Sequence, residues 1–340
     1  MKIIHVLNTN KFSGAEKVVI EIIKQSSPSD EIYYCSPKGT IQKELKKNNI
    51  KYLSISSLKS KKEFKKIVHQ INPDIIHAHD IRATFFSVLY SKKVPIISHL
   101  HGNSDPMKKL SLKSLMYLYS SYFVNHIIAV SKSTLNDYKF SKNIKSKTSV
   151  LYNFVDKENL LYHVNLDKKE YNYDFVYLGR ISYEKNPQKI AEIASLILKQ
   201  SKILKFAVIG DGPLKDRMEK IFVEQGVNDQ VDFLGFVENP YKILKSSKCM
   251  IMCSKFEGTP MVAIEALHLN VPIVSYPTDG LLELIIHGKN GYFAENEIDF
   301  VNYVNKILRE NKINNNKQNH LVTSEEYIES LNKIYFKALI

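Results

Sequence analysis

A chain of 340 residues is longer than a single hydrophobic core usually supports, so two domains of roughly 150 residues each are expected. Its 44% hydrophobic and 24% charged residues are typical of a globular protein. No run approaches the roughly 18 apolar residues of a membrane span. The first residues lack a signal-peptide pattern, so we expect a cytoplasmic protein.

The net charge of +13 is concentrated in the first part of the chain. Residues 1–150 hold 25 Lys or Arg against 10 Asp or Glu, a net charge of +15, and the remaining residues carry −2. A basic half indicates an anionic partner, which is nucleic acid, acidic lipid headgroups or a phosphorylated substrate.

Short apolar runs alternate with amphipathic stretches along the first half of the chain. Nearly continuous apolar strands are typical of parallel sheets covered on both faces, and parallel pairing requires helical crossovers. This half is therefore predicted to be a doubly wound α/β domain. Its expected strands are residues 2–7, 31–36, 74–79, 94–100 and 126–131, and its expected helices are residues 15–25, 41–49, 83–93, 110–124 and 133–140.

After a polar linker at residues 153–173 the pattern restarts, which predicts a second Rossmann-like domain. The last helix is expected at 324–339, behind a Thr323/Glu326 capping box and an exposed connection at 310–320. The second domain's expected strands are residues 174–179, 205–210, 231–236, 249–254 and 271–276, and its expected helices are residues 186–200, 213–225, 239–246 and 259–269.

These elements predict two α/β domains, residues 1–160 and 161–318, that face each other across a cleft. Residues 319–340 are expected to pack back toward the first domain, with an apolar face at Ile328, Leu331 and Tyr335. Open α/β sheets bind ligands at the carboxyl ends of their strands. Polar residues that directly follow strands are therefore the candidates for a site.

The first domain offers two candidates. Gly14 precedes a helix, where a glycine indicates either the close approach of a phosphate or sugar, or a plain tight turn. His99 and His101 share one face of the strand at 94–100. Because His101 stands at the carboxyl end beside Gly102, a functional role is favoured over a structural one.

In the second domain, Arg180 and Lys185 lie in the loop before a helix that Asn186 and Pro187 begin. Two cations beside a helix N-terminus are typical of a diphosphate site, and the alternative is two solvated surface charges. The next such loop has Gly210 and Gly212, which permit close approach, and Pro213, which is expected to begin a helix. No Asp-x-Asp follows a strand, so no metal site is expected.

Glu257 and Glu265 stand on either side of a helix start, with Thr259 as the expected N-cap and Pro260 as the first helical residue. Glu257 is then in the loop and Glu265 more than one turn inside the helix, so the two carboxylates do not share a helical face. A carboxylate buried in mid-helix needs polar partners, for which ribose hydroxyls are well suited.

The chain resembles the retaining glycosyltransferases of family 4, which have the GT-B fold of two Rossmann-like domains. The resemblance spans nearly the whole chain. It rests on SGAE at 13–16, HLHG at 99–102, GRISYEKN at 179–186, GDGP at 210–213, and Glu257 and Glu265 in the E-x7-E spacing of that family.

The resemblance implies roles for these residues. Arg180 and Lys185 would bind the diphosphate of a nucleotide-sugar donor, and Glu265 its ribose. Further donor contacts would come from Glu257, Gly210, Gly212 and the backbone of Thr259, Pro260, Met261 and Val262. The remaining implied contacts are His101 at the reacting carbon, Phe236 at the base, Gly14 at the diphosphate and acceptor, and Ser13, Ala15 and Glu16 on the acceptor side.

Two departures from the family pattern affect these assignments. The first loop is FSGAE where a Gly-Gly pair is common, which leaves the acceptor contacts open. Thr259 stands where an aliphatic residue is frequent, which leaves the identity of the sugar open.

The implied activity is retaining transfer of a hexose or N-acetylhexosamine, without cofactor or metal, from a nucleotide sugar. UDP is favoured as the nucleotide by its frequency in the family. The acceptor would be a glycan or a polyprenyl-diphosphate-linked glycan of a bacterial surface polysaccharide such as O-antigen or capsule. The alternatives are a nucleotide-sugar epimerase of the same fold and, less favoured, a polyanion-binding protein. No motif for nucleic-acid recognition supports the last.

Two basic stretches of the first domain, residues 59–70 and 107–123, combine lysines with Leu, Met, Tyr and Phe. One expectation is that these stretches bind an anionic membrane, which would place the protein peripherally on the inner face of the plasma membrane. The alternative is that they are solvated helix faces over an ordinary core.

Overall fold

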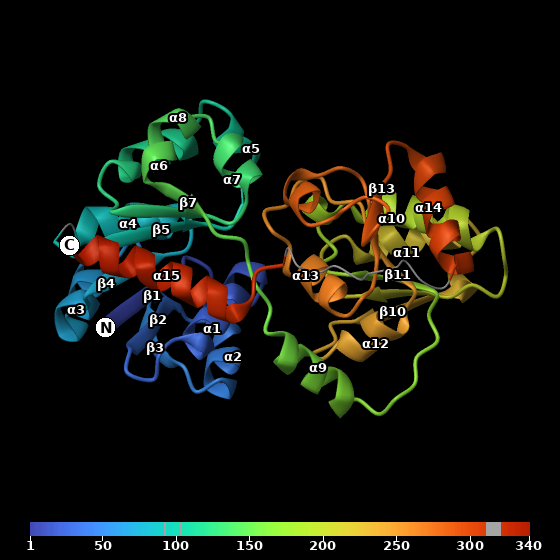
Figure 1. Ribbon diagram of the computed structural model, residues 1–340, viewed down its shortest axis with the longest axis horizontal. Helices are drawn as coiled ribbons and strands as arrows, with labels where there is room; N and C mark the ends of the chain where they lie inside the picture. Colours follow the sequence, from blue (N-terminus) through green and yellow to red (C-terminus); the bar gives the residue numbers. More distant parts are fainter. Residues whose placement is uncertain (92, 103, 311–320) are drawn as a thin grey trace. The chain divides into compact units, whose positions relative to one another are not determined.

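The computed structural model describes residues 1–91, 93–102, 104–310 and 321–340, which form two compact units. Unit 1 consists of Met1–Phe154 and Val322–Ile340, and unit 2 consists of Val155–Leu321 (Figure 1). The first boundary falls at 154/155 rather than 160/161, because helix α9 (Lys157–Leu166) belongs to unit 2. The predicted boundary at 318/319 and most of the connection predicted at 310–320 lie outside the described residues.

Unit 1 is built on a parallel sheet of order β3-β2-β1-β4-β5-β6-β7, so the direction of winding switches between β1 and β4. Its strands are β1 (Lys2–Val6), β2 (Glu31–Pro37), β3 (Lys51–Ile55), β4 (Ile75–Ala78), β5 (Ile96–Leu100), β6 (His126–Ala129) and β7 (Thr148–Val150). Its helices are α1 (Gly14–Gln25), α2 (Ile41–Lys47), α3 (Lys61–Ile71), α4 (Ile81–Tyr90), α5 (Asp105–Lys108), α6 (Leu112–Ser121), α7 (Lys132–Asn136), α8 (Ser141–Ile144) and α15 (Ser324–Leu339).

The central strands of unit 1 are buried along their whole length, as expected for a parallel sheet with helices on both faces. Helix α15 has the predicted Thr323/Glu326 capping box and contacts α1 and β5. The buried side chains of α15 are Tyr327, Leu331, Ile334 and Tyr335, and Ile328 is only partly buried. The end of the chain thus completes the core of unit 1.

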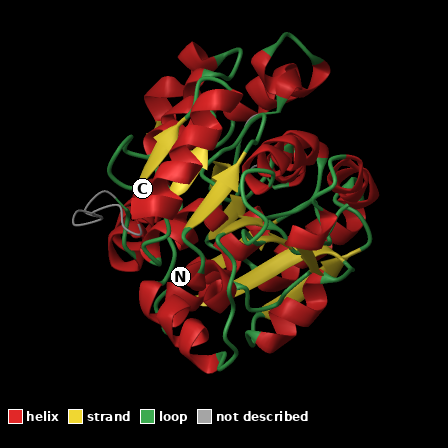
Figure 2. Cartoon of the chain, turned by 90° about the vertical axis from the view of Figure 1, so that its right-hand side faces the viewer, coloured by secondary structure: helices red, strands yellow, loops and turns green. Residues whose placement is uncertain are grey.

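Unit 2 repeats this architecture with a parallel sheet of order β10-β9-β8-β11-β12-β13, and Figure 2 shows strands lying between helices. Its strands are β8 (Phe175–Leu178), β9 (Phe206–Ile209), β10 (Val231–Gly235), β11 (Cys249–Met252), β12 (Ile273–Ser275) and β13 (Gly291–Phe293). Its helices are α9 (Lys157–Leu166), α10 (Pro187–Leu198), α11 (Lys215–Glu224), α12 (Tyr241–Ser246), α13 (Met261–His268) and α14 (Glu297–Glu310).

Three strands and the helices α5, α8, α9 and α14 have no counterpart in the sequence prediction, and α3 was expected only as one of two basic stretches. Strands β3, β7 and β13 lie at sheet edges and are short or partly exposed, so they lack the long apolar run of a central strand. Helix α9 occupies the polar stretch that was predicted to be a linker, and α14 lies beyond the last predicted strand.

The three cysteines are free and buried, with Cys35 on β2 and Cys249 on β11. No helix among the described residues combines the length and apolar character that crossing a membrane requires.

Candidate functional site

In unit 2 the winding direction switches between β8 and β11, which are neighbours in the sheet. The loop after β8 carries Lys185 and the loop after β11 carries Glu257. Because the carboxyl ends of parallel neighbours lie at one edge of the sheet, these two loops meet there. Nζ of Lys185 lies 2.5 Å from Oε1 of Glu257, and only 9% of the Glu257 side chain is exposed.

Backbone contacts hold the two loops in place. The N–H of Lys255 donates to the carbonyl of Glu184 over 2.8 Å. The hydroxyl of Tyr177 donates to the carbonyl of Arg180 over 2.8 Å, while the Arg180 residue is exposed. Burial, together with the charge of Glu257, raises the pKa of Tyr177, so this hydroxyl keeps its proton. A fixed backbone and a solvent-facing guanidinium suit Arg180 for binding an anion.

A third loop, after β12, supports the loop of Glu257 from behind. The N–H of Gly280 lies 3.4 Å from the carbonyl oxygen of Glu257. A Cβ atom at position 280 would lie 1.3 Å from the carbonyl oxygen of Gly258, so only glycine fits. No sequence pattern had marked Gly280, because its role depends on contact with a distant loop.

Gly210 and Gly212 do permit a close approach, but the approaching group is another loop of unit 2. A Cβ on Gly210 would lie 1.9 Å from the carbonyl oxygen of Gly179, and one on Gly212 would lie 2.3 Å from that of Ile181. Gly210 also has a φ of +138°, which disfavours other residues. These glycines therefore let the loops after β8 and β9 pack together. This packing explains why glycine is needed at both positions, whether or not a ligand binds there.

Two helix starts that the sequence analysis assigned to a particular proline fall later in the structure. Helix α11 begins at Lys215 rather than Pro213, and α13 begins at Met261, so that Pro260 and not Thr259 is its N-cap. The cause at α13 is the extended backbone of Pro260, with φ −70° and ψ 121°. In a helix that begins there, the first N–H groups without an intrahelical acceptor are those of Met261 and Val262.

The other two candidates of unit 2 differ in exposure. Glu265 lies inside α13 and is 2% exposed, which agrees with its predicted separation from the loop of Glu257. Phe236 follows β10 directly and is 72% exposed, beside Gly235 with a φ of +64°. An exposed ring at the carboxyl end of a strand is free to stack on a planar ligand.

The corresponding loop of unit 1 precedes α1. Glu16 is buried, and its carboxylate accepts hydrogen bonds from the hydroxyls of Ser13 and, over 2.7 Å, Thr9. Ser13 and Glu16 thus stabilise the loop. Gly14 and Ala15 remain more open, and a Cβ on Gly14 would have no atom within 4 Å. Among the residues that the structure describes, no contact requires glycine at position 14, which leaves room for a ligand there.

His101 belongs to a histidine cluster, which we define as His5, His77, His79, His99 and His101. Nε2 of His101 lies 3.0 Å from Nδ1 of His79, and its ring stacks on that of His99 with the centroids 4.1 Å apart. Burial lowers the pKa of His5 and His101 to about 3, and the pKa values of the other three also fall far below their usual value. At neutral pH the cluster is uncharged.

The sequence-predicted residues therefore divide between the units. Lys185 and Glu257 are in direct contact, Arg180 shares the loop of Lys185, and Glu265 lies on the helix that follows the loop of Glu257. Phe236 follows β10, which β9 separates from β8. His101 and residues 13–16 belong to unit 1. Among the described residues, the two groups that could hold a metal ion both lie in the histidine cluster. They contain no Asp-x-Asp motif, on which the expectation of no metal site was based.

Two family models match adjacent parts of the chain. Residues 13–159 match the family described as Glycosyltransferase Family 4, and residues 161–323 match Glycosyl transferases group 1. The two matched segments meet close to the boundary between the units.

Curated relatives and solved structures agree with these matches. The capsular polysaccharide biosynthesis glycosyltransferase CapH of Staphylococcus aureus is 24% identical over 81% of this chain and 81% of its own length. The O-antigen biosynthesis glycosyltransferase WclY of Escherichia coli is 22% identical over 97% of this chain and 95% of its own length. The fold is similar to that of Anabaena HepE, solved with UDP and glucose, with a TM-score of 0.85, 19% identity and 98% of each chain covered.

Proposed function

The chain belongs to the GT-B glycosyltransferases of the family 4 type, and from this premise we propose that it builds a bacterial surface polysaccharide. It transfers a hexose or N-acetylhexosamine from a nucleotide sugar to a glycan or to a polyprenyl-diphosphate-linked acceptor. The capsule and O-antigen assignments of similar proteins support the pathway. UDP is the proposed nucleotide, which the UDP complex of a protein of similar fold supports.

The observation that carries this proposal is the contact between Lys185 and Glu257 at the switch point of the unit 2 sheet. A carboxylate accepts hydrogen bonds from sugar hydroxyls, and an ammonium group with three N–H donors can contact Glu257 and a phosphate oxygen together. Arg180 adds a second cation on the same loop. One site thus offers complementary groups to the sugar and to the diphosphate of a single donor.

We propose that transfer retains the configuration of the sugar. The bond between the anomeric carbon and the phosphate oxygen breaks, and its electron pair leaves with the nucleoside diphosphate. The acceptor hydroxyl attacks on the same face, and a phosphate oxygen takes its proton. Arg180 and Lys185 stabilise the negative charge that develops on the diphosphate, so the step needs no metal ion or cofactor. In unit 1, His101 contacts the sugar and Gly14 lines the diphosphate and acceptor.

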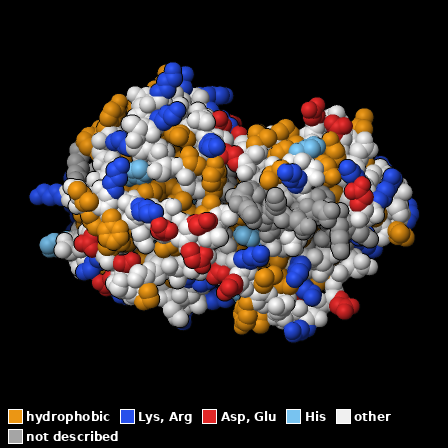
Figure 3. Space-filling view, viewed as in Figure 1, with side chains coloured by type: hydrophobic (Ala, Val, Ile, Leu, Met, Phe, Trp, Pro, Cys, Tyr) orange, Lys and Arg blue, Asp and Glu red, His pale blue; other side chains and the backbone are white. Residues whose placement is uncertain are grey.

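The protein works in the cytoplasm, on the inner face of the plasma membrane. Support comes from α6, whose buried side chains include Ser114, Tyr117 and Ser120, while Leu112 is 85% and Leu115 is 45% exposed. An ordinary surface helix has the opposite arrangement. Figure 3 shows hydrophobic and basic side chains intermixed around α6 and α8. Lysines near an anionic leaflet each contribute about 1 kcal/mol to binding.

The test begins with a thermal-shift screen of nucleotide sugars, because a bound donor raises the apparent stability by RT ln(1 + [L]/Kd). The stabilising donor is then incubated with the protein, with and without a polyprenyl-diphosphate-linked glycan, and released UDP is measured. Release that depends on the acceptor is expected. Conversion of the donor to its epimer without release would assign the site to an epimerase instead.

A further inference from the structure

The histidine cluster lies at the switch point of the unit 1 sheet. His5 on β1 pairs in register with His77 on β4, and His79 follows β4 directly. Open α/β sheets bind ligands at such points. Within the part of the chain that the structure describes, the following buried ring nitrogens have no hydrogen-bond partner: Nε2 of His5, Nε2 of His77, both nitrogens of His99 and Nδ1 of His101.

Buried polar groups in proteins are nearly always hydrogen-bonded, so a cluster with this many unpartnered nitrogens needs an explanation. Every neutral imidazole has one N–H donor and one lone pair. The rings of His5, His79 and His101 form a chain of two hydrogen bonds, of 2.8 and 3.0 Å. Whichever way the protons are ordered, a lone pair is left over at one end of this chain. A ligand that accepts lone pairs from several imidazoles at once would give these unpartnered nitrogens a partner.

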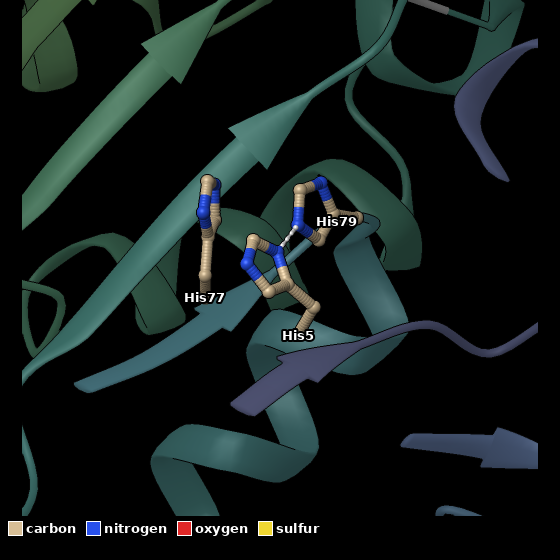
Figure 4. A group of neighbouring side chains, drawn as sticks. All are labelled: His5, His77 and His79. Atoms are coloured by element: carbon tan, nitrogen blue, oxygen red, sulfur yellow. Dashed lines mark hydrogen bonds between the residues drawn. The ribbon is translucent and has the colours of Figure 1, made fainter. Parts of the chain in front are cut away.

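We propose that His5, His77 and His79 bind one divalent transition-metal ion of the zinc class. One ligand atom of each residue lies within 4.8 Å of those of the other two, and all three residues are buried. Two Zn–N bonds of about 2.1 Å span up to about 4.2 Å, so small ring rotations close the site. Figure 4 shows His5 and His79 facing each other, with His77 beside them.

Contacts around these rings hold two of them in the orientation that a ligand needs. Nδ1 of His77 lies 2.7 Å from the hydroxyl oxygen of Tyr335, and Nδ1 of His79 lies 3.0 Å from Nε2 of His101. With the proton on Nδ1 in both rings, both hydrogen bonds form and the Nε2 lone pair of His77 is unpartnered. The Nε2 lone pair of His79 accepts from Nδ1 of His5 over 2.8 Å, and an ion at this group would replace that hydrogen bond. Metal-ligating histidines almost always donate their other N–H to a hydrogen-bond acceptor, which fixes the tautomer and the orientation of the ring.

The same cluster contains a second group, His79, His99 and His101. The first group is favoured because all of its residues are buried, whereas His101 is partly exposed. In addition, His77 has a hydroxyl partner on α15, 258 residues away in the chain. An ion at the first group would therefore connect β1, β4 and the C-terminal helix, and would stabilise unit 1 rather than act on the donor.

The direct test is the metal content of the purified chain. The protein is produced in zinc-supplemented medium, purified without chelators or metal-affinity resin, and analysed by inductively coupled plasma mass spectrometry. One zinc ion per wild-type chain is expected. The same content is expected for His99→Gln and for the matched control His69→Gln, an exposed histidine of α3. His77→Gln and His5→Gln should lose the ion while circular dichroism shows a folded chain.

A less disruptive substitution tests the proposal if His77→Gln and His5→Gln fail to fold. Tyr335→Phe retains the buried ring and removes only the hydroxyl next to His77, so zinc affinity should fall about 10- to 100-fold in competition with a chromogenic chelator. Protein produced with Co²⁺ should show the visible absorption bands of a cobalt–imidazole site. A wild-type chain free of transition metal would overturn the proposal, as would an ion lost in His99→Gln and kept in His77→Gln.

Discussion

Lys185 and Glu257 are 72 residues apart in the chain, yet the Lys185 ammonium lies 2.5 Å from the Glu257 carboxylate. The pair exists because β8 and β11 are neighbours in the sheet of unit 2. In this pair we assign the cation to the diphosphate of the donor and the carboxylate to its sugar.

Replacing Lys185 with alanine should lower kcat about 100- to 1000-fold, because one electrostatic contact to the leaving diphosphate is lost. The free energy of unfolding should fall by only about 1–3 kcal/mol, the value of one charged hydrogen bond. Steady-state UDP release and urea denaturation measure the two effects. Lys189→Ala, which removes a lysine paired with Glu297 on the outside of α10, is the matched control and should keep normal turnover. Near-normal transfer by Lys185→Ala would contradict the assignment.

Glu257 and Glu265 should differ in what they bind. Glu257→Ala should reduce sugar transfer while the Kd for UDP stays within about threefold of the wild type, because its carboxylate contacts the sugar. Glu265→Ala should raise the Kd for UDP about tenfold, the equivalent of about 1.4 kcal/mol, because its carboxylate binds the ribose. Isothermal titration calorimetry with UDP and kinetics with the nucleotide sugar separate the two effects. Equal loss of UDP binding in both variants would reject this division.

Gly14→Ala should leave the fold intact and impair transfer. The added methyl group meets no atom of the described residues within 4 Å, so the free energy of unfolding should change by less than about 0.5 kcal/mol. A shift of the bound ligand by about 1 Å can lower the reaction rate up to about 100-fold. The kcat/KM of this variant should therefore fall at least about tenfold. Gly280→Ala gives the contrast, since its methyl group would collide with Gly258 and lower the melting temperature. Unchanged kinetics in Gly14→Ala would indicate a plain turn.

His268 on α13 should make unit 2 less stable at acidic pH. Burial, with a smaller effect of Lys157, lowers its pKa to about 4 in the folded chain. The unfolded chain therefore takes up a proton first as the pH falls, and stability that is complete above about pH 6.5 is lost toward pH 4. The slope is at most about 1.4 kcal/mol per pH unit, and less because the ring is partly exposed.

Urea denaturation of His268→Leu between pH 7 and 4 should accordingly show a smaller decrease in stability than the wild type. His69→Leu, at an exposed position on α3, is the control and should follow the wild-type curve. Parallel curves for His268→Leu and the wild type would contradict the prediction.

The exposed leucines of α6 should contribute to membrane binding. Leu112→Asp and Leu115→Asp should abolish flotation with vesicles of anionic lipid without changing the melting temperature, because both side chains face solvent. Ile203→Asp, at an 84% exposed position in unit 2, is the control and should still float. Flotation of the wild type that does not depend on anionic lipid would remove the membrane proposal.

Much of the fold was predictable because it is encoded locally. The central strands are apolar along their whole length, and the amphipathic pattern of the sequence located helices such as α1 and α15. The edge strands β3, β7 and β13 were missed, since a short strand with one open side carries no continuous apolar signal. The start of α13 was wrong by one residue, because Pro260 is compatible with both the extended and the helical backbone.

The sequence by itself determined that there are two doubly wound domains, and that Lys185 and Glu257 each follow a strand, because strand periodicity and helix-start residues act over a few neighbours. Only the tertiary structure decided that these two side chains touch, that Gly280 must be glycine, and that Tyr335 reaches His77 from 258 residues away. Each of these contacts joins distant segments. They depend on the order of strands in the sheet and on the docking of α15, which no local pattern specifies.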